Sequence, residues 1–176
     1  MNPRVLVFTY KDGLLARLAH DLQLSCRSFS VARTGETITA RFALGTLKVD
    51  GAVERGCVAP GVLSDGDRRK IEQTMADDVL ELRRFAEARF AGTLAIRGAD
   101  PVVDGTLTLH GRTVPLGPVT ARQRDGLWVA EVSLVPSRWG IAPYRALAGA
   151  LKLQDRLTVR IELPVDRGDG DATWSV

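Results

Sequence analysis

The residues best suited to acid–base or nucleophilic chemistry are His20, Asp21, Cys26 and His110. An imidazole beside a carboxylate is a common acid–base arrangement. However, neighbouring residues point to opposite faces of a strand and lie about 100° apart on a helix, so His20 and Asp21 do not face one reacting atom. A capping aspartate beside a partly exposed histidine is the simpler interpretation. An enzymatic hypothesis therefore requires that several of these four residues converge in one cleft.

Metal and cofactor sites are not indicated by the sequence. With two histidines, a three-ligand zinc site would need carboxylates at spacings that the chain does not have. No serine lies in a Gly-x-Ser-x-Gly motif, and the glycines form no phosphate-binding pattern. Cys26 and Cys57 belong to no Cys-x-x-Cys motif, and we interpret both as free thiols. We therefore expect no catalytic residue, no metal and no cofactor.

The composition is that of an ordinary globular domain. The chain has 176 residues, of which 45% are hydrophobic and 26% charged, and its 24 basic and 21 acidic residues are too evenly balanced to indicate nucleic-acid binding. No stretch approaches the roughly 20 apolar residues needed to span a membrane. Because we also see no signal peptide, we expect a cytoplasmic protein. A homodimer is one of the oligomeric states that the sequence allows. We predict one domain over residues 1–166 and a polar, frayed tail over 167–176, which Trp174 could dock.

Short alternating segments dominate the chain. Residues 5–10 predict a strand that is apolar on both faces. Apolar and polar residues alternate with a period of two, as in half-buried strands, over residues 37–44, 89–97, 128–134 and 157–163. Such strands, separated by turn residues, predict a β-sandwich or a β-barrel.

Residues 104–116 predict a β-hairpin. Leu107 and Leu109 share one face, Thr106 and Thr108 share the other, and Gly111 interrupts the pattern. A glycine suits a turn that requires a positive φ angle. We expect the leucines to face inward and His110 to serve in turn hydrogen bonding.

Two segments have helical spacing instead. From Asp67 to Phe85, Ile71, Met75 and Val79 recur at intervals of four, which predicts an amphipathic helix capped by Ser64 or Asp65. From Asp12 to Gln23, leucines recur at a similar spacing and predict a second, shorter helix.

Several motifs resemble the YceI-like, polyisoprenoid-binding family. The match consists of Gly-Thr-Leu-Thr-Leu-His-Gly-Arg-Thr-Val-Pro at 105–115, Phe90 just after the helix, the Ser-x-Trp-Gly-Ile element ending at Ile141, and Asp155–Ile161 as a closing strand. The resemblance covers about residues 33–164. It implies a lipocalin-like antiparallel β-barrel of about eight strands with one or two inserted helices, which stays hollow and binds or transports a long apolar chain. Family members are often exported, whereas we see no signal peptide here.

The candidate binding residues follow from the inward faces of these strands. A barrel of about eight strands either fills its interior with side chains or holds one small ligand. The residues that we expect to line it are Phe42, Phe90, Leu94, Leu107, Leu109, Trp128, Val132 and Val159. We add Trp139 and Tyr144 from the apolar stretch 139–147. If this stretch is exposed, it suits a barrel mouth, a partner site or a membrane-touching rim. If it is buried, it plugs the barrel end.

Two functional hypotheses thus stand beside the enzymatic one. In the first, the barrel binds an elongated apolar ligand, such as an isoprenoid, an isoprenoid quinone or a fatty-type lipid, without catalysis. In the second, the barrel is filled and acts as a protein-interaction or stress-associated module, with the helix and the stretch Trp139–Leu147 as its surface. In the first hypothesis the helix also suits the role of a lid over one mouth.

Overall fold

The computed structural model describes residues 2–12, 20–98, 100–146, 151–165 and 171–176. This part of the chain contains one α-helix, α1 (Asp65–Thr74), and short helical turns at Leu44–Thr46, Met75–Val79 and Pro136–Trp139. The strands are β1 (Arg4–Asp12), β2 (Asp21–Cys26), β3 (Phe29–Thr34), β4 (Thr37–Ala43), β5 (Leu47–Glu54), β6 (Cys57–Val58), β7 (Glu87–Arg97), β8 (Asp100–Leu109), β9 (Arg112–Arg124), β10 (Leu127–Leu134), β11 (Arg145–Ala146), β12 (Leu151–Pro164) and β13 (Ala172–Ser175).

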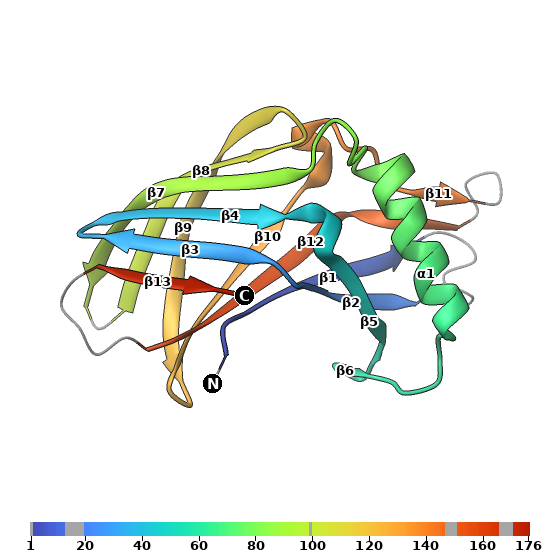
Figure 1. Cartoon of the computed structure of the whole chain (residues 1–176). Coiled ribbons are helices and arrows are strands. Elements are labelled where there is room, and N and C mark those ends of the chain that lie inside the picture. Colours follow the sequence, from blue (N-terminus) through green and yellow to red (C-terminus); the bar gives the residue numbers. More distant parts are fainter. Residues whose placement is uncertain (1, 13–19, 99, 147–150, 166–170) are drawn as a thin grey trace.

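All the strands belong to one antiparallel sheet that curls strongly (Figure 1). Its order is β13-β3-β4-β7-β8-β9-β10-β12-β1-β2-β5-β6, and β11 pairs with β12. The predicted all-β antiparallel class with an inserted helix is therefore confirmed. The order runs between two different end strands, β13 and β6, so a closed barrel of about eight strands is not confirmed by the pairing alone.

A corner divides the long hairpin that begins with β2. On one side of the corner β2 pairs with β5, and on the other side β3 pairs with β4. Two backbone hydrogen bonds continue the pairing through the bend, from Arg27 N to Thr46 O and from Ala43 N to Ser28 O. The Thr46 hydroxyl also donates to Ala43 O and accepts from Ser28 N. The chain thus turns sharply without losing its cross-strand bonds.

The β8–β9 hairpin confirms the prediction for residues 104–116. His110 and Gly111 form its two-residue turn with φ angles of 50° and 73°. Two successive positive φ angles match the twist of the flanking strands, as in type I′ turns. Thr108 and Thr113 face each other across the hairpin, with their hydroxyls 2.8 Å apart.

Helix α1 is shorter than the predicted helix over Asp67–Phe85. Its start is as predicted, because the Ser64 side chain accepts a hydrogen bond from Asp67 N while the Asp67 carboxylate accepts from Ser64 N. The Ser64 hydroxyl also donates to the Asp67 carboxylate, and this bond, followed by the one from Ser64 N, lowers the pKa of the Asp67 carboxyl. The helix gives way to a π-helical turn over Met75–Val79, and Glu81, with a φ of 47°, ends the helical backbone.

The predicted helix over Asp12–Gln23 is wrong at both of its ends. Asp12 ends β1 and Asp21 begins β2, while residues 13–19 lie outside the described part of the chain. In β2, Leu22 and Leu24 are buried on one face, so the period of two decides the local structure. The Asp21 carboxylate accepts a hydrogen bond from Lys11 N.

The expectation of a frayed tail is wrong for its last residues. β13 pairs with the outer edge of β3, and Phe29 and Val176 exchange backbone hydrogen bonds beyond it. The indole of Trp174 donates to Pro164 O at 3.0 Å, so this residue does dock the segment. The C-terminal residues therefore cover an edge that β3 would otherwise expose.

Candidate ligand-binding cavity

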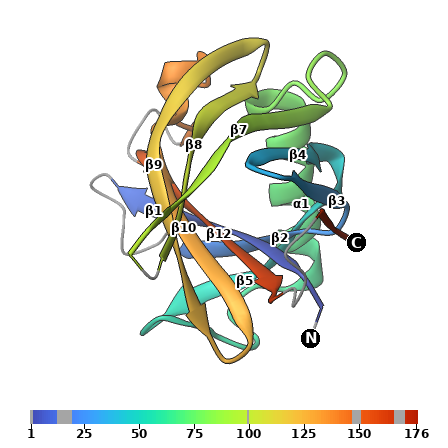
Figure 2. The ribbon, with the colours of Figure 1, turned by 90° about the vertical axis from the view of Figure 1, so that its left-hand side faces the viewer.

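The curled sheet encloses an apolar cavity of about 390 Å³. The strands whose inner faces line it surround a common space (Figure 2). Each alternating face predicted from the sequence supplies lining residues, as the inner face of β10 illustrates with Trp128, Ala130, Val132 and Leu134. The volume lies within the range of about 300–1,000 Å³ that is usual for small-molecule sites.

Eight of the ten predicted binding residues line the cavity together: Phe42, Phe90, Leu94, Leu107, Leu109, Trp128, Val132 and Val159. The other two, Trp139 and Tyr144, are not among the lining residues. Leu147 lies outside the described residues. Whether the eight residues bind a ligand stays a prediction.

Trp139 forms the centre of a buried cluster beside the cavity, which we call the Trp139 cluster. The Trp139 side chain has no exposed surface, and Ala88, Leu107, Leu134 and Ile141 pack in the same cluster. Its indole N–H donates to Leu107 O at 2.9 Å. Of the alternatives for this stretch, burial therefore describes Trp139 and Ile141, and a surface role for Trp139 is wrong.

Two facing glycines leave room for Phe90 against the cavity wall. Gly92 of β7 lies opposite Gly105 of β8. A Cβ atom on Gly105 would lie 2.4 Å from Ala91 O and 2.7 Å from Phe90 Cζ, and one on Gly92 would lie 2.8 Å from Phe90 Cζ. The absence of side chains at both positions lets the ring lie over the backbone, which keeps volume in the interior free.

The opposite end of the cavity is less enclosed. Arg33 and Ile38, beside the β3–β4 turn, line this end, together with Leu163 and Trp174; we call these four residues the Arg33 end. Ile96, near the end of β7, also lines the cavity although 67% of its surface is exposed. Solvent therefore reaches the interior where β7 ends.

Sequence reasoning missed several lining residues. Leu80, from the segment after α1, lines the cavity, whereas Ile71 and Met75 pack against a separate cluster around Leu24. Arg33 and Trp174 were missed because β3 and β13 were not predicted as strands. The alternation of Phe29, Val31 and Arg33 was the available signal for β3.

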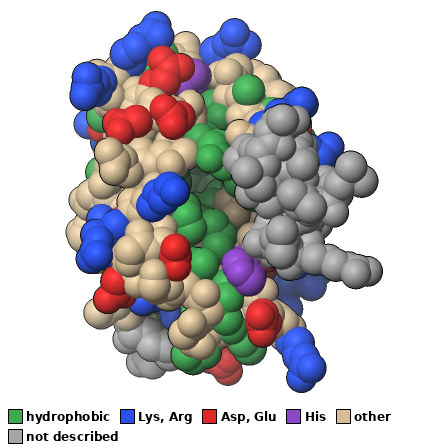
Figure 3. All heavy atoms as spheres, turned by 90° about the vertical axis from the view of Figure 1, so that its right-hand side faces the viewer, with side chains coloured by type: hydrophobic (Ala, Val, Ile, Leu, Met, Phe, Trp, Pro, Cys, Tyr) green, Lys and Arg blue, Asp and Glu red, His purple; other side chains and the backbone are tan. Residues whose placement is uncertain are grey.

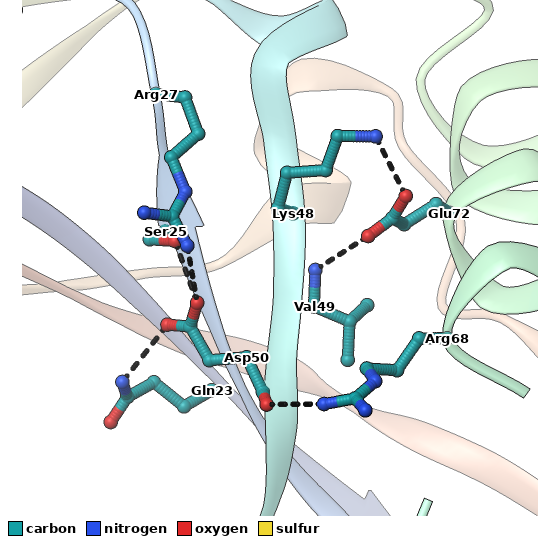
Figure 4. Close-up of polar contacts among 8 residues, drawn as sticks. All are labelled: Gln23, Ser25, Arg27, Lys48, Val49, Asp50, Arg68 and Glu72. Carbon is teal, nitrogen blue, oxygen red and sulfur yellow. Dashed lines mark hydrogen bonds and ion pairs between the residues drawn. The ribbon is translucent and has the colours of Figure 1, made fainter. Parts of the chain in front are cut away.

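A hollow containing hydrophobic side chains marks the side of the molecule on which α1 lies (Figure 3). The α1 segment itself is held there by polar contacts with β5 (Figure 4). Glu72 accepts hydrogen bonds from Val49 N at 2.9 Å and Lys48 Nζ at 2.8 Å, and Arg68 donates to Asp50 O. Glu72 thus occupies a backbone N–H at the edge of β5.

The environment of Glu72 alters its acidity. Burial raises the pKa of this carboxyl, but hydrogen bonds from Lys48 and Val49 N, with the nearby charges of Lys48 and Arg68, outweigh burial and hold the pKa below its ordinary value of 4.5. Glu72 is therefore a carboxylate at neutral pH, as its contact with Lys48 requires.

Three side chains donate hydrogen bonds to the Asp50 carboxylate, which gives it a structural role. It accepts hydrogen bonds from Gln23 Nε2 at 3.0 Å, Ser25 Oγ at 2.7 Å and Arg27 Nη2 at 3.2 Å (Figure 4). These donors come from β2 and the corner after it. They tie β2 to β5 beside the register shift between Gln23 and Leu24, and they leave the carboxylate occupied.

No hydrogen bond or ion pair joins any two of His20, Asp21, Cys26 and His110 in the described part of the chain. The Cys26 thiol contacts Ser28 O and Thr46 Oγ1. His110 packs its ring against Phe85, with the centroids 4.2 Å apart, and its Nε2 lies 3.2 Å from Glu81 Oε1 without hydrogen-bonding geometry. Cys26 and Cys57 are both free, as predicted.

Within the described ranges, no group of three or more His, Cys, Asp or Glu side chains could hold a metal ion. No described helix has the length and apolar character needed to cross a membrane.

The sequence matches the model of the YceI-like domain over residues 21–165, and the chain therefore belongs to the YceI-like family. Among curated proteins, none matches the sequence significantly.

Solved structures share the fold at low sequence identity. BcnA of Burkholderia cenocepacia is 14% identical with a TM-score of 0.62, over 93% of this chain and 96% of its own. A polyisoprenoid-binding domain from Saccharophagus degradans, implicated in plant cell wall breakdown, is 13% identical with a TM-score of 0.58, over 92% and 91% of the two chains.

Proposed function

We propose that this protein binds an elongated apolar ligand, such as an isoprenoid, an isoprenoid quinone or a fatty-type lipid, and does not transform it. The observation that carries the proposal is the cavity of about 390 Å³, whose lining is apolar apart from Arg33. Each methylene group that leaves water for such a lining contributes roughly 0.8 kcal/mol to binding. An extended hydrocarbon chain therefore needs few polar contacts to bind.

We infer that eight strands surround the ligand as a barrel. Support comes from the corner, where backbone hydrogen bonds continue β2 into β3 and β4 into β5, so that each pair acts as one long bent strand. Counted in this way, β1 borders the first long strand and β7 borders the second. With β8, β9, β10 and β12, these strands make eight.

Two further observations support the binding role over a filled interaction module. A filled barrel requires a packed interior, which a cavity of this volume argues against. The Saccharophagus degradans neighbour is described as a polyisoprenoid-binding domain. The cytoplasmic location and the homodimer stay predictions.

Native mass spectrometry after gentle purification tests the proposal directly. We expect a bound apolar molecule, or uptake of an isoprenoid quinone or a fluorescent fatty acid by the empty protein. A protein that is purified empty and takes up neither probe would contradict the proposal. Extraction of the bound molecule after prolonged incubation tests the absence of catalysis, because a changed mass would indicate a reaction.

A matched pair of variants on β7 tests the place of binding. Leu94→Trp places a tryptophan at a cavity-lining position, whereas Thr93→Trp places the same side chain at its exposed neighbour. We expect the first variant to lose uptake and the second to retain it, with similar circular dichroism for both. Equal uptake by the two variants would show that the ligand binds elsewhere.

A further inference from the structure

Arg33 is the only charged residue among the described residues that line the cavity. Its position follows from the alternation in β3, where Phe29 and Val31 on the same face are 4% and 5% exposed. Its cross-strand neighbours are Ile38 of β4, which also lines the cavity, and Ala172 of β13. The fold therefore places a cation at an inward position that is otherwise occupied by apolar residues.

The guanidinium of Arg33 is oriented by the β3–β4 turn, where the Asp171 carboxylate accepts a hydrogen bond from Gly35 N. Its Nε donates to Gly35 O at 3.0 Å, within the β3–β4 turn. Among the described residues, no carboxylate forms an ion pair with it, whereas Arg4 pairs with Glu162 and Arg160 with Glu131 on other strands. A guanidinium has five N–H donors, so the two terminal nitrogens keep donors available for an acceptor.

The surroundings strengthen attraction to an anion. Attraction between opposite charges increases as the effective dielectric constant falls below that of water, and apolar neighbours such as Ile38 and Leu163 replace water beside Arg33. The planar guanidinium matches the two oxygens of a carboxylate or a phosphate. The nearby indole of Trp174 does not compete for an anion, because its N–H is bonded to Pro164 O.

We propose that Arg33 binds the anionic head group, a carboxylate or a phosphate, of an amphiphile whose apolar chain lies in the cavity. This proposal rests on the proposed binding of an apolar ligand and adds the direction in which that ligand lies. The head group lies at the Arg33 end, and the chain runs from there toward residues such as Leu109 and Leu134. The preferred ligand class is then an anionic amphiphile rather than a neutral hydrocarbon.

The test compares ligands that share a chain and differ in the head group. Oleate is compared with oleyl alcohol, and geranylgeranyl phosphate with geranylgeraniol, by direct binding to the full chain. We expect the wild-type protein to bind at least one anion roughly 10-fold or more tightly than its alcohol, as for hydrogen bonds to charged groups. Oleate and the phosphate form separate arms, so the preferred anion identifies the head group.

Arg33→Gln removes the charge, and Arg41→Gln is the matched control because Arg41 is an exposed residue of the adjacent strand β4. We expect Arg33→Gln to bind the anions no better than the alcohols, with alcohol affinity unchanged. We expect Arg41→Gln to keep the wild-type preference. Unchanged alcohol affinity also shows that the Arg33→Gln variant is folded.

Other outcomes separate this proposal from the one on which it rests. A wild-type protein that binds alcohols and anions equally, or an Arg33→Gln variant that keeps the preference, would overturn the role of Arg33 and leave apolar binding intact. A wild-type protein that binds none of the four ligands would count against both.

Discussion

The two ends of β7 differ: one is packed in a buried cluster, and the other lies where the cavity meets solvent. Ala88, at one end, is 5% exposed and packs in the Trp139 cluster, whereas Ile96, at the other end, lines the same cavity and is 67% exposed. The first end is a packed core with a satisfied indole N–H. The second end has a charged residue, Arg33, and contact with solvent. One strand thus serves a structural region and a region suited to ligand entry.

The largest expected effect is at the buried end. Trp139→Ala should lower the free energy of unfolding by about 3–5 kcal/mol, because it removes a large buried side chain. Ile96→Ala, at the exposed end, should change it by less than about 0.5 kcal/mol. Urea unfolding of both variants measures the difference. Similar losses for the two variants would mean that the ends are equally important for stability.

A smaller effect is expected in the middle of the wall between these ends. Gly105→Ala should destabilise the protein by about 1–3 kcal/mol, because the added methyl group meets Ala91 O and the Phe90 ring. Gly117→Ala is the matched control, since a Cβ there meets nothing within 4 Å. The same urea titration, combined with probe uptake, shows whether displacing Phe90 also reduces the cavity.

Equal stability of Gly105→Ala and Gly117→Ala would contradict this prediction, because it would show that Ala91 and Phe90 make room for a methyl group at no cost.

The smallest effect is expected outside the cavity, where α1 contacts β5. Glu72→Gln should cost about 1 kcal/mol at neutral pH, because a charged acceptor for Lys48 and Val49 N is lost at a partly exposed site. Since the folded-state pKa of Glu72 lies below 4.5, its stabilising contribution is present above pH 4.5 and is lost as the pH falls through the folded-state value. Thermal unfolding as a function of pH measures this dependence.

Glu54→Gln is the control, because Glu54 lies at an exposed position of β5. This variant should leave the pH dependence of stability unchanged. Ligand uptake should be the same in both glutamate variants at neutral pH. A loss of uptake in Glu72→Gln alone would instead connect α1 to the cavity, as the sequence-based hypothesis of a lid proposed.

The strand faces that line the cavity could be predicted, because the alternation of a strand is visible in a few consecutive residues. Every second residue from Leu157 to Leu163 and from Trp128 to Leu134 lines the cavity, as the alternation indicates. In β2 the period of two also holds, but the helical spacing of the leucines from Asp12 to Gln23 concealed it in the sequence. Burial of Leu22 and Leu24 against Val49, a contact between distant segments, decides the structure there.

Features that depend on distant contacts could not be predicted. The burial of Trp139 depends on Leu107 O, which is 32 residues away. The hollow interior depends on Phe90 lying over Gly105, and neither residue type by itself distinguishes a cavity from a packed core. Arg33 becomes notable only when its strand is known and every neighbour on its inner face proves apolar.

The pairing of β1 with β12 has a consequence for how the protein is made. Arg4 lies opposite Glu162, so β1 has one partner close by in the sequence, β2, whereas its second partner, β12, is separated from it by almost the whole sheet. Contacts of such long sequence separation slow folding, and unpaired strand edges favour aggregation in the meantime. The edge of β1 that pairs with β12 therefore stays unpaired until β12 has been synthesised, and the cavity is complete only after that pairing forms.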